Sequence, residues 1–352
     1  MKTVLCTLYN NLYLDKGLVL YDSLKACCQD FVLYVLCMDD KCYEALSDIN
    51  ADNMIPIRLE DFEDEELLKI KPTRSFGEYC WTCTPSIILY VIEKYKEPVC
   101  TYIDADMCFY HNPQVLIDEM ISANKSVLIV PHRFTKVNKG LEANGIYCVE
   151  FNTFLDQEDS LEVLKQWRKD CLGNCTSEND GEHFGDQKYL DQWPQKYDCV
   201  YVCPHLGAGV APWNIQSYRL VSMNDDGVKL LERRSRSRVE LIFYHFQNIE
   251  YLDEKRVKIN VFEGKINVQY RLVEALYLGY LYKLNQKKAF LLNSYKLNVL
   301  IRRHPAKVDS VRRKDFHFLS GLRQLSVEKL VGFFLHYFPR KSDILMIPDI
   351  LE

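Results

Sequence analysis

The chain has 352 residues, of which 48% are hydrophobic and 26% charged, an ordinary globular composition that excludes a disordered or fibrous protein. Its formal net charge of −5 is unevenly distributed: residues 255–352 hold 19 Lys and Arg against 8 Asp and Glu, or +11, which leaves −16 for residues 1–254. We therefore expect two modules, residues 1–254 and residues 255–352. The acidic first module disfavours a nucleic-acid partner, since phosphate backbones are bound by basic surfaces.

The N-terminus and the cysteines indicate the compartment. The first residues hold no apolar secretory segment, and no stretch approaches 18 consecutive apolar residues, so we expect a cytoplasmic protein. The 14 cysteines are scattered through apolar, strand-like runs, which is typical of reduced core thiols.

The first part of the chain alternates between apolar runs of strand length and segments with helical apolar spacing. The expected strands are residues 3–9, 31–38, 54–59 and 99–103, and the expected helices are 17–28, 41–46 and a longer one that contains Pro85. Continuous apolar strands alternating with helices predict a doubly wound α/β sheet.

The alternation continues to residue 246 and then stops. It comprises helices at 113–123 and 160–170, a short helix from near Gly185, and strands at 126–130, 145–155, 199–203 and 241–246. Beyond residue 255 the apolar spacing is helical and the charge basic, which predicts a helical C-terminal extension without further strand–helix alternation.

Two carboxylates follow the expected strand 99–103. Asp104 and Asp106 stand two residues apart in the segment Tyr102-Ile-Asp104-Ala105-Asp106. In an open α/β sheet ligands bind beyond the carboxyl ends of the strands, where two carboxylates can hold a hard divalent ion against a diphosphate. The plainer alternative is a solvated turn with two surface acids.

Six segments, in chain order, resemble the nucleotide-sugar glycosyltransferases of the GT-A fold, and most of all the bacterial glycogenin and lipopolysaccharide galactosyltransferase-like group. They are Cys6-Thr7-Leu8-Tyr9 with the following Gly17–Leu24, Glu78–Pro85, Tyr102–Asp106, Gly185-Asp186-Gln187, Ala211-Pro-Trp213-Asn214 and Phe243-Tyr-His245-Phe246. Their ordered occurrence over residues 1–250 is more specific than any one motif. The resemblance implies a Rossmann-like GT-A mixed sheet followed by the C-terminal helical extension.

The same resemblance implies a metal site. Asp104, Asp106 and His245 would bind Mn²⁺ or Mg²⁺, which neutralises the leaving diphosphate, and Asp104 would also touch the nucleotide. His205 is the competitor for the histidine position. Either histidine could instead be a core residue bonded to backbone.

Donor-binding and catalytic positions follow from the other segments. Asp186 and Gln187 match a pair beside the donor sugar, where they would stabilise a developing positive charge, although Gly-Asp before a helix is also a common cap. The remaining donor-binding positions implied are Thr7, Tyr9 and Tyr13, expected beyond the first strand where the base would stack, and Trp213 and Asn214. An aromatic residue at such a position is as often plain core.

One segment departs from the pattern. Relatives have Gly-x-Tyr-Asn-x-Gly ahead of the donor sugar, whereas this chain has Gly145-Ile-Tyr147-Cys148-Val-Glu150. An amide that would bond a sugar hydroxyl is missing, so the identity of the sugar is open. Glu150 could replace the amide or face solvent.

These features predict a metal-dependent transferase that moves a hexose from a nucleotide-diphosphate sugar, UDP being the expected nucleotide, to a saccharide or lipid-linked acceptor in surface polysaccharide synthesis, with retention. A non-catalytic sugar-nucleotide-binding protein is the alternative. A sugar-phosphate nucleotidyltransferase is a further alternative. It is disfavoured because that class usually opens with a glycine-rich, basic phosphate loop, whereas Gly17 is the only glycine in residues 1–30.

The basic extension has two interpretations. Its apolar and basic residues, in Lys287–His304, Arg312–Lys314 and Val327–Tyr337, would suit peripheral contact with the anionic inner face of the membrane. The same residues would equally pack against the sheet domain or form a homodimer interface.

Overall fold

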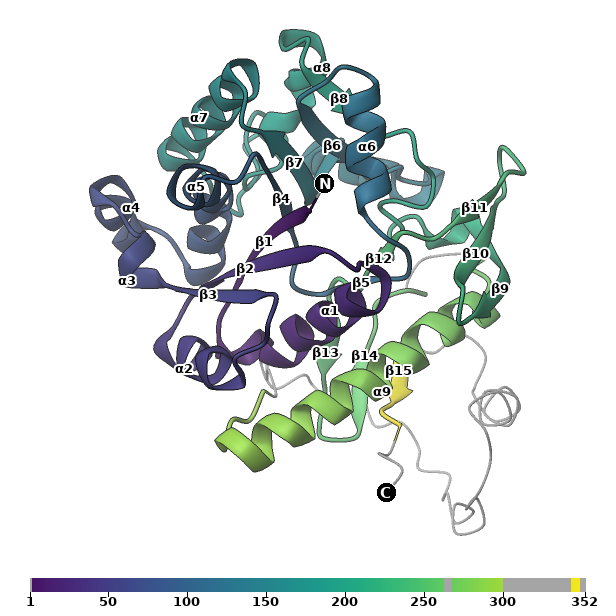
Figure 1. Cartoon of the computed structure of the whole chain (residues 1–352). Coiled ribbons are helices and arrows are strands. Elements are labelled where there is room, and N and C mark those ends of the chain that lie inside the picture. Colours follow the sequence, from purple (N-terminus) through teal and green to yellow (C-terminus); the bar gives the residue numbers. More distant parts are fainter. Residues whose placement is uncertain (1, 263–267, 300–342, 349–352) are drawn as a thin grey trace, which may run out of the picture.

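The protein is built around one mixed sheet of seven strands. The computed structural model describes residues 2–262, 268–299 and 343–348. The strand order is β3-β2-β1-β4-β7-β6-β8 (Figure 1). These strands are β1 (Thr3–Tyr9), β2 (Phe31–Cys37), β3 (Met54–Arg58), β4 (Val99–Ile103), β6 (Val127–Pro131), β7 (Tyr147–Leu155) and β8 (Val200–Val202). The expected α/β class with a mixed sheet is confirmed.

One strand of the main sheet runs opposite to the other six. β3, β2, β1 and β4 run parallel, whereas β7 lies antiparallel between β4 and β6. Every residue of β1 and β2 is buried, as expected for interior strands covered on both faces. The pairing of β4 with β7 places the end of β4 beside the middle of β7, with Ile103 opposite Phe151.

Helices pack on the sheet and on one another. α5 contacts β1, β4 and α7, while α9 runs along α1 in the lower part of Figure 1. Ser75 and Glu78 form a capping box at the start of α5, and Pro85 lies inside this helix as expected. The helices are α1 (Leu14–Cys27), α2 (Asp40–Ile49), α3 (Leu59–Phe62), α4 (Glu65–Ile70), α5 (Phe76–Tyr95), α6 (Gln114–Ser122), α7 (Glu158–Gly173), α8 (Trp193–Lys196) and α9 (Tyr270–Tyr295).

A small ribbon stands apart from the main sheet. The expected strand near residues 241–246 forms β12 (Phe243–His245), which pairs antiparallel with β5 (Met107–Phe109). His245 lies opposite Met107, the residue after Asp106. The ribbon therefore joins two segments far apart in the sequence at the end of β4.

Two further antiparallel sheets had no clear signal in the sequence. One contains β9 (Tyr218–Asn224), β10 (Gly227–Glu232) and β11 (Arg238–Glu240). The other contains β13 (Glu250–Tyr251), β14 (Arg256–Lys258) and β15 (Ile344–Met346). The expected C-terminal helix is present as α9, but β14 and β15 are strands beyond residue 255, which the helical spacing did not predict.

Strand pairing crosses the expected boundary at residues 254 and 255, because β13 pairs with β14. The division into two modules stays a prediction. Of the basic tail, residues 300–304 at the end of Lys287–His304, Arg312–Lys314 and Val327–Tyr337 lie outside the described residues. None of the described helices combines the length and apolar character that crossing a membrane requires.

Candidate active site

The two carboxylates of the Asp-x-Asp segment lie where β4 ends. Asp104 and Asp106 follow Ile103 directly, and their side chains are 30% and 15% exposed. The Tyr102 hydroxyl donates to Asp104 Oδ1 at 3.1 Å. Both acids are therefore half-enclosed by the protein, and the solvated-turn alternative does not describe them.

His245 meets both acids. Its Nε2 lies 2.9 Å from Asp106 Oδ1 and 3.7 Å from Asp104 Oδ2. Backbone hydrogen bonds fix the approach, since the Phe246 amide donates to the Asp106 carbonyl and the His245 amide to the Val210 carbonyl. One ligand atom from each of the three side chains lies within 4.8 Å of the others. Two carboxylate oxygens and an imidazole nitrogen at this spacing suit a divalent ion such as Mn²⁺ or Mg²⁺.

The electrostatics of the group show how strongly its members interact. Burial, the largest cause, raises the pKa of Asp104 to about 6. Burial also acts to raise the pKa of Asp106, but the charge and hydrogen bond of His245 outweigh it and lower that pKa. Burial alone would lower the pKa of His245, yet the neighbouring Asp106 holds it well above the ordinary value. The two carboxylates therefore favour a positive charge at this position.

The second ring nitrogen of His245 faces Glu150. Nδ1 lies 2.7 Å from Glu150 Oε2, and the Glu150 side chain is fully buried on β7. Of the two possibilities for this departure from the family pattern, exposure to solvent is excluded.

His205 lies elsewhere. It is half-buried in the loop after β8, and its Nδ1 accepts a hydrogen bond from the Gly207 amide at 3.2 Å. Among the described residues, the groups spaced to hold a metal include His245 and not His205. The geometry thus favours His245 of the two candidates.

Trp213 and Asn214 lie in the loop beneath His245. The Trp213 ring packs edge-on against the His245 ring at 5.4 Å between centroids. Asn214 is fully buried, and its side-chain amide donates to the carbonyls of His132 and Gly209 while its oxygen accepts from the Ala211 amide. Both residues therefore brace the loop that supports His245, and their contact with a donor stays a prediction.

Asp186, which Gln187 follows in the chain, interacts electrostatically with the Asp-x-Asp segment. Burial and the charge of Asp104 raise the pKa of Asp186 to about 7, so the two carboxyls are close enough to interact. Gln187 donates from Nε2 to the Asn144 carbonyl at 2.8 Å, which ties it to the loop before β7. The short helix expected near Gly185 is the 3-10 helix Lys188–Gln192, and the Gln187 side chain makes no cap hydrogen bond to it. Catalytic roles for the pair stay predictions.

Thr7, Tyr9 and Tyr13 do not all lie where expected. Thr7 and Tyr9 are still within β1, buried and paired opposite β2, because the parallel pairing continues to the end of that strand. The Tyr9 ring lies against α1, where a Cβ at Gly17 would come within 2.3 Å of it. Tyr13 lies just after the strand, with its ring 4.6 Å from Lys16 Nζ. Their contact with a nucleotide base stays a prediction.

Lys16 was missed by the sequence reasoning. It is a buried lysine at the start of α1, 3.4 Å from Asp15 Oδ1, and its charge contributes to the lowered pKa of Asp106. Asp15 in turn accepts from the Tyr251 hydroxyl at 2.5 Å. The signal available was the charged pair Asp15-Lys16 directly before the uncharged run Gly17–Tyr21 of the same helix, since buried charges must be paired.

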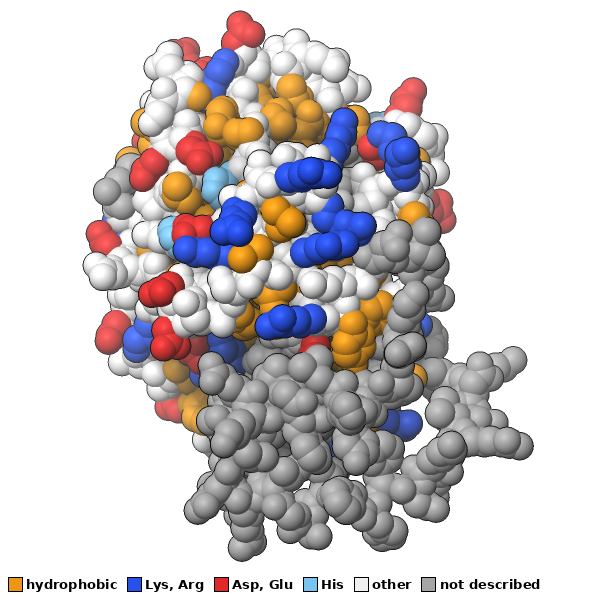
Figure 2. All heavy atoms as spheres, turned by 90° about the vertical axis from the view of Figure 1, so that its right-hand side faces the viewer, with side chains coloured by type: hydrophobic (Ala, Val, Ile, Leu, Met, Phe, Trp, Pro, Cys, Tyr) orange, Lys and Arg blue, Asp and Glu red, His pale blue; other side chains and the backbone are white. Residues whose placement is uncertain are grey.

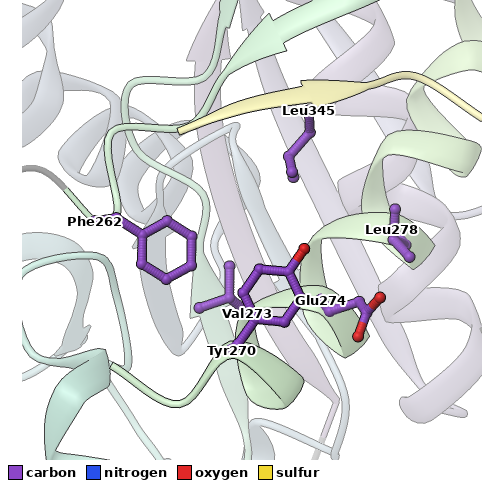
Figure 3. A pocket seen from close by; sticks show the side chains of 6 residues that line it. All are labelled: Phe262, Tyr270, Val273, Glu274, Leu278 and Leu345. Atoms are coloured by element: carbon purple, nitrogen blue, oxygen red, sulfur yellow. The ribbon is translucent and has the colours of Figure 1, made fainter. Parts of the chain in front are cut away.

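A separate cavity lies between α9 and β15 (Figure 3). The side chains that surround it are mainly apolar: Phe262, Tyr270, Val273, Glu274, Leu278 and Leu345. Glu274 is buried, and neither carboxylate oxygen has a hydrogen-bond partner among the described residues. The cavity contains none of the residues of the Asp-x-Asp site.

The fold and site together define an α/β protein with an Asp-x-Asp and histidine cluster at the carboxyl end of a central strand. No family model matches the chain. It is 33% identical to the uncharacterized protein YfnD of Bacillus subtilis (strain 168) over 257 residues, which cover 72% of this chain and 80% of that protein. The chain belongs to the family of YfnD. It is also 27% identical to the uncharacterized protein YfnF of the same organism, over 73% of this chain and 85% of that one.

Solved structures give a more distant comparison. Mouse xyloside xylosyltransferase 1 in its apo form matches with 10% identity and a TM-score of 0.45, over 70% of this chain and 98% of that chain. The galactosyltransferase LgtC, solved with donor and acceptor sugar analogues, matches with 12% identity and a TM-score of 0.43, over 70% and 87%.

Proposed function

We propose that this chain is a metal-dependent glycosyltransferase that moves a hexose from a nucleotide-diphosphate sugar to a saccharide or lipid-linked acceptor. One observation supports it above all: Asp104 and Asp106 at the end of β4 are joined by His245 from a distant strand, in an arrangement suited to a divalent ion. UDP is the proposed nucleotide, and retention at the sugar carbon the proposed stereochemistry.

The chain's own residues divide into two groups in this proposal. Asp104, Asp106 and His245 would hold Mn²⁺ or Mg²⁺, which supplies charge neutralisation to the leaving diphosphate. Asp186 and Gln187 would bind the sugar and stabilise the positive charge that develops on it. Asp186 is 6% exposed, so its charge is little screened by solvent.

Calorimetry with UDP, in the presence and absence of Mn²⁺, tests the metal site. Asp104→Asn and Asp106→Asn should each remove the Mn²⁺-dependent part of UDP binding and leave the thermal unfolding transition in place. His245→Ala should weaken that binding more than His205→Ala, because only His245 lies against the acids. Unchanged UDP affinity in both aspartate variants would contradict the metal site, and a stronger effect at His205 would contradict the choice of histidine.

A second candidate function is sugar-nucleotide binding without catalysis. The observation that favours it is the buried Cys148 and Glu150 in place of an Asn and a Gly that relatives have beside the donor sugar. Hydrolysis or transfer of a UDP-hexose with Mn²⁺ separates the two functions: turnover identifies the transferase, and binding without turnover identifies the alternative. The anomeric configuration of a product, read by NMR, tests retention.

The acceptor and the place of action complete the proposal. We propose that the enzyme acts in the cytoplasm, on an acceptor presented at the inner face of the membrane, in surface polysaccharide synthesis. The described part of the tail favours packing, since Lys287 Nζ lies 2.6 Å from Asp22 Oδ2 and Leu291 is fully buried. Sedimentation with phosphatidylglycerol vesicles at low and high salt tests membrane contact. Absence of binding at low salt would contradict it.

A further inference from the structure

We infer that Glu150 is a positioning residue, which holds the His245 ring so that its Nε2 faces the two aspartates. This inference rests on the proposed metal site and adds to it a residue from the segment in which the chain departs from the glycosyltransferase pattern that it resembles. It follows from four observations about the surroundings of His245.

The first observation is the contact itself. Glu150 Oε2 lies 2.7 Å from His245 Nδ1, while Nε2 on the other side of the ring lies 2.9 Å from Asp106 Oδ1. An imidazole whose Nδ1–H donates a hydrogen bond to a carboxylate presents Nε2 as the ligand atom. The ring cannot turn without breaking that hydrogen bond. The two contacts therefore stabilise the same orientation of the His245 ring.

The second observation is burial. Glu150 is fully buried and His245 is 3% exposed, so water does not compete for their hydrogen bond. A buried carboxylate is costly unless it is paired, and His245 is the partner of Oε2. Oε1 has no hydrogen-bond partner among the described residues. Since Oε2 is taken by His245 and the side chain has no open surface, Glu150 is poorly placed to replace the missing amide at a sugar hydroxyl.

The third observation is the space made for the carboxylate. Gly209 has a φ of +71°, and a Cβ there would come within 3.0 Å of Glu150 Oε1 and 2.7 Å of a Val130 methyl. The loop Gly207–Asn214 thus carries a glycine where Glu150 packs against it. The same loop receives the His245 amide at the Val210 carbonyl and supplies Trp213, whose ring packs edge-on against His245.

The fourth observation is the position of Glu150 in the sheet. β7 pairs with β4 up to Ile103 opposite Phe151, and the Glu150 carbonyl accepts from the Asp104 amide at 3.3 Å. Glu150 is therefore tied through backbone to one metal-site residue and through its side chain to another. A glycine at this position would make the first contact but not the second.

The experiment measures Mn²⁺ affinity directly, by electron paramagnetic resonance of free Mn²⁺ with UDP present, on the full chain. Glu150→Ala should weaken Mn²⁺ binding about 10- to 100-fold, the effect of removing a carboxylate behind a histidine ligand. Glu150→Gln keeps an acceptor oxygen at the same distance and should lose less. Glu150→Asp keeps the charge but withdraws it from Nδ1, and should lose more than Glu150→Gln.

Glu274→Ala is the matched control, because Glu274 is also a buried glutamate but lies on α9 beside the separate cavity. Its Mn²⁺ affinity should equal that of the unmodified chain. Should Glu150→Ala fail to fold, the comparison of Glu150→Asp with Glu150→Gln still decides. Native affinity in folded Glu150→Ala, or in both Asp and Gln variants, would overturn the inference. Absence of Mn²⁺ binding by the unmodified chain would instead contradict the proposed function.

Discussion

At the scale of single residues, the site depends on a histidine whose two ring nitrogens both face carboxylates. Asp106 and Glu150 lie on opposite sides of His245 at 2.9 and 2.7 Å. Burial raises the pKa values of Asp104 and Asp186, whereas the charge and hydrogen bond of His245 outweigh burial and lower the pKa of Asp106. Carboxyls that differ in this way can take different roles, one set holding an ion and another binding substrate.

Replacing Asp186 with Asn, or Gln187 with Glu, should leave UDP affinity within about twofold and lower turnover by about 10²- to 10³-fold, the typical loss for a group that acts on charge in the transition state. UDP affinity is measured by calorimetry and turnover by release of UDP. An equal loss of UDP affinity in both variants would indicate a structural role instead.

Glu274 should make the protein less stable as the pH rises. Burial raises its pKa from 4.5 to about 7, so the folded chain keeps a proton that the unfolded chain has released between these values. Because the folded state binds more protons in this window, stability falls from pH 4.5 to pH 7 and stays lower above it.

Glu274→Gln should remove that fall and raise stability at pH 8 by up to about 3 kcal/mol, since one pKa unit corresponds to about 1.4 kcal/mol. Urea unfolding at pH 5 and pH 8 measures it, with the exposed Glu44→Gln as control. A Glu274→Gln curve parallel to that of the unmodified chain at both pH values would refute the prediction.

At the scale of elements, the contact of β1 with α1 depends on one glycine. Tyr9 at the end of β1 is 3% exposed, and its ring lies where a Cβ of Gly17 would be. The close approach lets α1 lie against the strand that leads toward the site. Around Gly279 in α9, by contrast, no described atom beyond its chain neighbours and the helix's own backbone lies within 4 Å of where a Cβ would be.

Gly17→Ala should therefore destabilise the protein by about 1–3 kcal/mol through overpacking. Gly279→Ala, also within a helix, should stabilise it by about 0.5–1 kcal/mol, because alanine limits the unfolded chain and favours the helix. Both are read from the midpoint of urea unfolding. A stabilising Gly17→Ala would show that the Tyr9 ring moves aside without cost.

At the scale of the whole molecule, the end of the chain returns to the extension that precedes α9. Asp343 Oδ1 accepts from the amides of Val261 and Phe262 at 2.6 and 2.7 Å, and β15 pairs with β14.

Basic side chains are exposed on the sheet of β9–β11 and its turns. They are Arg219, Lys229, Arg233, Arg234, Arg236 and Arg238. Figure 2 shows Lys and Arg gathered on this side of the molecule, so the acidic module is not uniformly acidic.

Asp343→Ala should lower the free energy of unfolding by about 1–3 kcal/mol, because it leaves two amides without their acceptor. Met346→Ala on the same strand, where the side chain is 48% exposed, should have an effect below about 1 kcal/mol. Thermal unfolding compares the two. Similar midpoints for both variants would show that Asp343 does not hold the chain end.

The sequence by itself determined the local features of this protein. Apolar runs of strand length marked all seven main-sheet strands with each end within two residues, because strands covered on both faces are mostly apolar. They also placed Asp104 and Asp106 after the end of β4. The same reasoning placed α5 around Pro85 and α9 in the basic extension. It did not predict strands β9–β11, whose polar residues interrupt the apolar runs that marked the main sheet.

Tertiary structure decided what depends on contacts between distant segments. Pairing of β12 with β5, which no local pattern encodes, brings His245 and not His205 to the two acids. The antiparallel direction of β7 likewise sets Glu150 behind that histidine, and a residue that in the sequence could as well have faced solvent becomes fully buried. Side-chain identity is local, whereas the partner of a buried charge is chosen by which strands lie side by side.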